Sequence, residues 1–316
     1  MTAEDGEDVP LSGLRLLDRI GDGGQGEVHA VAGPPGILYK AYRPALRPDG
    51  GALAALVRVR RDLVPDERDW WDERTAWPLC RVTDGGRVTG FLMRRAPDSM
   101  TWRPPGGGGT KLTELAYLLR PAKAAWRAVV QPTPEERYAL AVAVVDLVDR
   151  LHAMGLVLGD LSQANVLWTV RPAPAVHLLD CDGIRQAGRG PVLAQADTID
   201  WNDPLAPPGA VTVDSDRYKA ALALGRILAQ DPYTAPGTVF APVPGVLDER
   251  REAAVRRLYV QAAGPFGSRP SLGEWRTALS GRGVIKLLAA RPAPRPAVDP
   301  SKFDGARRRG TISLRE

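Results

Sequence analysis

The sequence predicts an α+β protein, rich in strands in its N-terminal part and mainly helical in its C-terminal part. Two observations predict the strands. Apolar and polar residues alternate around a glycine-rich segment at 20–28, and a second pair of such runs flanks Asp84-Gly85-Gly86, a hairpin signal. One observation predicts a helix: Thr133-Pro134-Glu135-Glu136 has the residues of a capping box with proline at the first helical position, and a long apolar segment follows.

Turn-forming residues divide the N-terminal part into short elements. Pro34-Pro35-Gly36 separates two strand-like runs. Pro65 ends a helical pattern in which Leu53 and Leu56 share a face. We expect residues 1–13 to be disordered. The elements expected next are two strands within 14–32, a third strand ending at Lys40, a helix at 51–63, a helical turn at 66–73, and strands at 78–82 and 88–93.

The C-terminal part has a helical pattern with irregular connections. Residues 103–110 are rich in proline and glycine and predict a surface loop, and Pro121 interrupts the helical region after it. The elements expected next are a helix from Thr133 to about Met154, an irregular segment at 184–213, helices at 214–229 and 249–263, and a last helix with Trp275 and Leu279. Residues 286–316 are Pro-rich and then basic, which predicts a disordered tail.

Composition excludes several classes of protein. The 316 residues are 44% hydrophobic, enough for a sizeable core, and the net charge of +5 does not by itself indicate a nucleic-acid partner. The two cysteines, Cys80 and Cys181, form neither a zinc pattern nor a disulfide framework. There is no signal-like N-terminus and no apolar run of ~20 residues. We therefore expect a cytoplasmic protein with no nucleic-acid and no membrane partner.

A glycine pattern lies between the first two expected strands. Gly21, Gly23, Gly26 and Val28 fit G-x-G-x-x-G-x-V. In a dinucleotide-binding turn a helix would follow, but this sequence continues as a strand. The next strand ends at Lys40, which could contact phosphate.

A second pattern combines acidic and amide side chains. Asp160 and Asn165 are five positions apart between two apolar runs, and a further apolar run leads into Asp180-Cys181-Asp182-Gly183. A hairpin would bring Asp160, Asn165 and Asp180 to the same end. A carboxylate can accept a proton from a hydroxyl, and carboxylate and amide oxygens are ligands that Mg²⁺ favours. Asp182 is either a second metal ligand or a turn-former.

Together and in this order, the glycine pattern, the strand lysine, D-x-x-x-x-N and D-x-D resemble the eukaryotic-like protein kinase superfamily, in a divergent bacterial form. The resemblance extends from about Leu14 to about Leu279. It implies a bilobal protein-kinase-like fold with an N-lobe at 14–95 and a C-lobe at 96–285. It also implies ATP- and Mg²⁺-dependent phosphoryl transfer to a serine or threonine hydroxyl of a protein substrate.

The resemblance also implies a role for individual residues. Asp160 would be the catalytic base, and Asp216 would brace the catalytic loop from a following helix. Asn165 and Asp180 would hold the metal. Phosphate would be held by Gly21, Gly23, Gly26, Val28 and Lys40, and adenine by the hinge backbone around Met93 and Arg95.

The sequence departs from the family pattern at several positions. Leu158-Gly159 replaces the usual His-Arg before the catalytic aspartate, and Ser162 replaces a lysine. The acid that should pair with Lys40 could be Asp62, Glu67 or Glu73. Two other functions stay open: a nucleotide-binding pseudokinase scaffold, and a small-molecule kinase similar to the aminoglycoside phosphotransferases. His152 and His177 are interpreted as structural, and His29, in a strand near the glycine-rich segment, as a surface residue.

Overall fold

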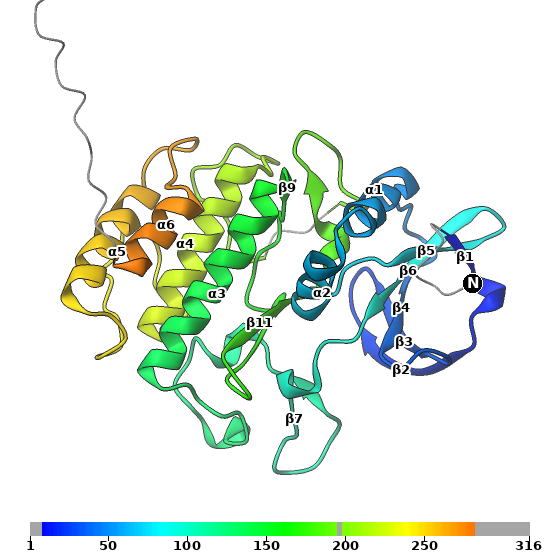
Figure 1. Ribbon diagram of the computed structural model, residues 1–316, viewed down its shortest axis with the longest axis horizontal. Coiled ribbons are helices and arrows are strands. Elements are labelled where there is room, and N and C mark those ends of the chain that lie inside the picture. Colours follow the sequence, from blue (N-terminus) through cyan, green and yellow to red (C-terminus); the bar gives the residue numbers. More distant parts are fainter. Residues whose placement is uncertain (1–7, 195–197, 282–316) are drawn as a thin grey trace, which may run out of the picture. The chain divides into compact units, whose positions relative to one another are not determined.

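The computed structural model describes residues 8–194 and 198–281. All of these described residues belong to one compact unit. The second unit, 283–316, contains the expected tail at 286–316 and lies outside the described residues. Figure 1 shows a sheet formed by the N-terminal strands (blue and cyan) and a group of helices formed by the C-terminal part (green to orange). The α+β class is therefore confirmed.

The N-terminal part forms a six-stranded sheet in the order β1-β5-β6-β4-β3-β2. β1 runs parallel to β5, and the other neighbours are antiparallel. β4 lies inside the sheet, and its alternate side chains pack into two different apolar clusters. The strands are β1 (Asp8–Pro10), β2 (Leu16–Asp22), β3 (Gly26–Val31), β4 (Ile37–Tyr42), β5 (Cys80–Asp84) and β6 (Arg87–Arg94).

The start of the chain differs from the expectation. Residues 8–13 are ordered, as β1 and a 3-10 turn, whereas residues 1–13 were expected to be disordered. The reason is that Val9, Leu11 and Leu14 pack on the face of the sheet that carries Ile37 and Tyr39. Residues 1–7 lie outside the described residues.

Two helices lie between the third and fourth of the expected strands. α1 (Gly50–Arg61) begins at Asp49, whose carboxylate accepts the N–H groups of Gly51 and Ala52 at 2.8 and 2.9 Å. α2 (Pro65–Arg74) is a full helix where only a turn was expected. Its Trp71 is buried and packs edge-on against Trp77, with ring centroids 4.9 Å apart. Burial of this large aromatic side chain explains why the polar sequence of α2 is helical.

The C-terminal part contains four longer helices, α3 (Pro134–Ala153), α4 (Val213–Ala229), α5 (Glu249–Ala262) and α6 (Leu272–Ser280). The capping box expected at α3 is formed by Thr133 and Glu136. α3 packs against α4 and α6, and α5 packs against α4 and α6. None of the helices in the described ranges is long and apolar enough to cross a membrane.

The segment between the two parts is less helical than expected. Residues 115–126 form only two 3-10 turns, Leu115–Tyr117 and Ala124–Trp126. Pro121 lies between them, and proline lacks the N–H that a continuous helix needs. Leu115, Leu118 and Leu119 are nevertheless fully buried in the main core. Packing therefore holds this connection in place, together with the few backbone hydrogen bonds of the two 3-10 turns.

Candidate active site

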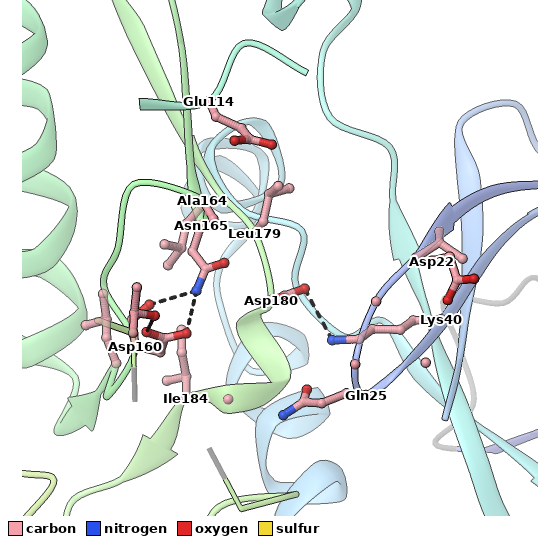
Figure 2. Close-up of a pocket in the computed structure, with 18 residues that line it drawn as sticks. Asp22, Gln25, Lys40, Glu114, Asp160, Ala164, Asn165, Leu179, Asp180 and Ile184 are labelled. Atoms are coloured by element: carbon pink, nitrogen blue, oxygen red, sulfur yellow. Dashed lines mark hydrogen bonds and ion pairs between the residues drawn. The ribbon is translucent and has the colours of Figure 1, made fainter. Parts of the chain in front are cut away.

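A cavity of about 510 Å³ lies between the glycine-rich turn and the segment 158–184 (Figure 2). The residues that line it come from the end of β2, the glycine-rich turn, β3, β4, and the segments 158–165 and 178–184, together with Glu114 and Thr198. Most of the residues singled out from the sequence are among them: Gly23, Gly26, Val28, Lys40, Asp160, Asn165 and Asp180.

The hairpin of β10 (Val166–Thr169) and β11 (Ala175–Leu178) brings Asn165 close to Asp180. Val166 pairs with Leu178, and the N–H of Leu179 donates to the carbonyl oxygen of Asn165 at 2.8 Å. Asp180 has a left-handed backbone, with φ of 51°. Aspartate tolerates this conformation better than most residues, which matches its use at the start of the tight turn 181–183.

Asp160 lies on the cavity with both carboxylate oxygens accepting hydrogen bonds. The Asn165 amide donates to Oδ2 and to the backbone oxygen of Asp160, both at 2.9 Å. The hydroxyl of Thr198 donates to Oδ1 at 2.8 Å. The two residues of the D-x-x-x-x-N pattern are therefore in direct side-chain contact, and the Thr198 alcohol already donates to the Asp160 carboxylate.

Gly159 explains one departure from the family pattern. It has φ of 77°, a conformation that strains any residue with a Cβ, so an arginine would be unfavourable here. Asp216 in α4, whose side chain is fully buried, holds this loop by hydrogen bonds. Its carboxylate accepts the N–H groups of Leu158 and Gly159 at 2.7 and 2.9 Å. His152 contacts the same carboxylate at 3.1 Å. The hydrogen bonds expected of Asp216 as a brace for this loop are therefore present.

Lys40 is buried and contacts two carboxylates from one turn. Its Nζ lies 2.7 Å from Asp182 and 3.2 Å from Asp180. Burial alone would lower the pKa of Lys40, but the charges of Asp182 and Asp180 outweigh it and raise the pKa. The paired acids are therefore not Asp62, Glu67 or Glu73. Sequence reasoning missed this role of Asp182, although its place in D-x-D was the available signal.

The glycines at 21–26 have different reasons for being glycine. A Cβ on Gly26 would overlap the carbonyl oxygen of Ala41, so Gly26 permits the close approach of β3 to β4. A Cβ on Gly24 would meet nothing within 4 Å, and one on Gly23 only the Gly26 oxygen at 3.9 Å. Both glycines of this turn line the cavity, and the N–H of Gly23 donates to the carbonyl oxygen of Gly26 at 2.9 Å. Gly21 is not among the lining residues.

Met93 and Arg95 do not line the cavity. Met93 is buried in β6, where it pairs with Leu38, and the N–H of Arg95 donates to the oxygen of Gly36 at 2.7 Å. The adenine contact at this hinge stays a prediction. Glu114, which was not singled out from the sequence, does line the cavity, and burial raises the pKa of its carboxyl. It follows a glycine-rich loop without periodicity, so no sequence signal marked it.

The oxygen atoms near the hairpin are chemically suited to Mg²⁺. The Asp180 side chain is 60% exposed, and the Asn165 oxygen points away from Asp160 on the side of Asp180 (Figure 2). Mg²⁺ usually takes one or two protein carboxylates together with substrate phosphates. Within residues 8–194 and 198–281, no group of three or more His, Cys, Asp or Glu is arranged to hold a metal ion.

No protein-family model matches the chain, and no curated protein matches it either.

Proposed function

We propose that this protein transfers a phosphoryl group from ATP, with Mg²⁺, to a serine or threonine hydroxyl of a protein. One observation carries the proposal: Asp160, which accepts a hydroxyl hydrogen bond, lies on the same cavity as Lys40 and the glycine-rich turn. This arrangement places an acceptor for the alcohol proton, a cation for phosphates and a glycine-rich turn around one space.

We further propose that the chain has a bilobal kinase-like fold, with the sheet as N-lobe and the helices α3–α6 as C-lobe. Its support is topological. The strand that carries Lys40 is flanked by β3 and β6, and the hairpin with Asn165 and Asp180 follows the longest helix, α3. The cavity lies where residues from these two parts meet.

The roles of the residues follow from their contacts. Asp160 would orient the substrate hydroxyl and accept its proton, in the place where the Thr198 hydroxyl now donates. Lys40 would contact the phosphates, and the glycine-rich turn at 23–24 would lie beside them. Asp180 and Asn165 would hold Mg²⁺, which when bound neutralises the negative charge of the phosphates.

A second candidate, a nucleotide-binding scaffold, is favoured by Ser162. In the family that this chain resembles, a lysine at this position lies near the γ-phosphate. Here the residue is Ser162, which is uncharged and only 1% exposed. Its side chain therefore supplies no cation to the cavity. The charge that this lysine supplies to the transferred group would then be missing.

Incubation of the purified protein with γ-labelled ATP and Mg²⁺ tests the proposal. Protein acceptors and small alcohols, including aminoglycosides, would be compared, and nucleotide binding would be measured in parallel. Asp160→Asn should lower the transfer rate by at least ~10²-fold while leaving ATP binding nearly intact. Binding without transfer to any acceptor would favour the scaffold, and transfer to small alcohols alone would favour the small-molecule kinase.

A further inference from the structure

The two carboxylates that contact Lys40 lie in very different surroundings. The side chain of Asp182 is 1% exposed, whereas that of Asp180 is 60% exposed. An ion pair with an exposed partner is weak and screened by salt, while a buried, hydrogen-bonded pair is costly to break. The two contacts to Lys40 are therefore unequal, although both come from one turn.

Asp182 is fixed through both of its oxygens. Oδ1 accepts from Lys40 at 2.7 Å, and Oδ2 accepts from the hydroxyl of Tyr42 at 3.1 Å. Lys40 and Tyr42 are two residues apart on β4, so they project from the same face of the sheet. Asp182 therefore joins the turn after β11 to the strand β4 at two points.

The helices α1 and α2 do not supply a carboxylate to Lys40. Asp72 in α2 forms a bidentate pair with Arg60 of α1, with both contacts at 2.5 Å, and also meets Arg94 at 2.8 Å. Glu73 pairs with Arg74 at 2.8 Å, and Glu67 lies 3.8 Å from Arg150. No movement of these helices is needed to place Lys40.

We propose that Asp182 is the positioning residue of Lys40 and keeps it in the cavity whether or not nucleotide is bound, whereas Asp180 is an exchangeable partner. The second half rests on the proposed function: Asp180 would leave Lys40 and turn to the metal when Mg–ATP binds. In this arrangement Lys40 is held by a residue of the turn after β11, next to Asp180, the proposed metal ligand. The family that this chain resembles instead uses a helix carboxylate, and among the described residues no carboxylate of an α-helix contacts Lys40.

Amine labelling of lysines tests the first half without any nucleotide. A trace amount of an acylating reagent modifies each lysine in proportion to its accessible, uncharged amine, and mass spectrometry gives the rate for Lys40. Asp182→Asn should accelerate the labelling of Lys40 by at least ~10-fold, because it weakens the charge-assisted hydrogen bond that holds the buried amine in place. Asp180→Asn should change it by less than about 3-fold, because an exposed partner contributes little.

Lys219 is the internal control for unfolding. It is buried in α4 and donates to the oxygen of Gly159 at 2.7 Å, so it should stay protected in both variants. If Asp182→Asn exposes Lys219 as well, Tyr42→Phe decides the test, because it frees one Asp182 oxygen and keeps the charge. That variant should accelerate Lys40 labelling by about 5-fold, as expected for one lost hydrogen bond of ~1 kcal/mol.

Equal acceleration of Lys40 labelling by Asp180→Asn and Asp182→Asn would overturn the proposal. So would a labelling rate of Lys40 in Asp182→Asn that equals the wild-type rate. Where Tyr42→Phe decides the test, the same criterion applies to that variant. Calorimetry with Mg–ATP is the second arm. Lys40 should stay protected in the wild type when Mg–ATP is bound, and new labelling there would overturn the exchange of Asp180. A wild type that binds no Mg–ATP would refute the proposed function, while the labelling result for Asp182 would stand.

Discussion

Replacing Asp216 by alanine should loosen the segment that carries Asp160. The change removes the acceptor of two buried N–H groups, those of Leu158 and Gly159. Loss of a partner for a buried donor costs ~1–3 kcal/mol, so the two together predict a loss of about 2–6 kcal/mol in the free energy of unfolding. This is a large part of the ~5–15 kcal/mol that stabilises a typical domain.

Urea unfolding followed by tryptophan fluorescence measures this loss. The matched control is Asp149→Ala, which removes a partly exposed carboxylate paired with Arg276 at 2.8 Å. A pair of that kind contributes ~0–1 kcal/mol. Asp216→Asn keeps one acceptor oxygen but directs an NH₂ group at the other donor, so its loss should be intermediate. If Asp216→Ala costs no more than Asp149→Ala, the bracing role is wrong.

Three further outcomes are expected. Gly26→Ala should lower the free energy of unfolding by ~1–3 kcal/mol, and with it the melting temperature, because its methyl would overlap the Ala41 oxygen. Gly24→Ala has open space around it and should change the melting temperature little, so equal shifts in the two variants would contradict the packing argument. Burial lowers the pKa of His177, so the unfolded chain takes up its proton first as the pH falls below ~6.5. Stability present above that pH is then lost by up to ~1.4 kcal/mol per pH unit, and His177→Asn should flatten the acid limb of a plot of unfolding free energy against pH. Thr133→Ala should cost about 1 kcal/mol by removing the helix cap, as seen in urea unfolding, and no change would argue against the cap.

The sequence predicted best those features that depend on local chemistry. The α3 helix was predicted because Thr133 and Glu136 satisfy N–H groups within one turn, and the contact of Asn165 with Asp160 is also local. The partner of Lys40 was missed because it is 142 positions away and depends on how the turn after β11 meets β4. Spacing along a chain cannot show which of several acids a fold brings to a buried lysine.

The ordered N-terminal strand was missed for a similar reason. β1 contains only Asp8, Val9 and Pro10, too short a run to show any periodicity. Its order comes from pairing with β5 and from apolar contacts made across the sheet. These are tertiary interactions, and they outweigh the polar composition that suggested disorder.

The two borders of this sheet have consequences for how the protein behaves at high concentration. An unpaired border strand offers N–H and C=O groups to another molecule and so promotes aggregation. β1 shields β5 from such pairing, and Pro10 removes one donor from the new border. At the opposite border, β2 is irregular in register between Leu16 and Gly21, which disfavours a regular added strand. Removing residues 8–10 would therefore uncover β5 and turn a strand that is now shielded into a template for self-association.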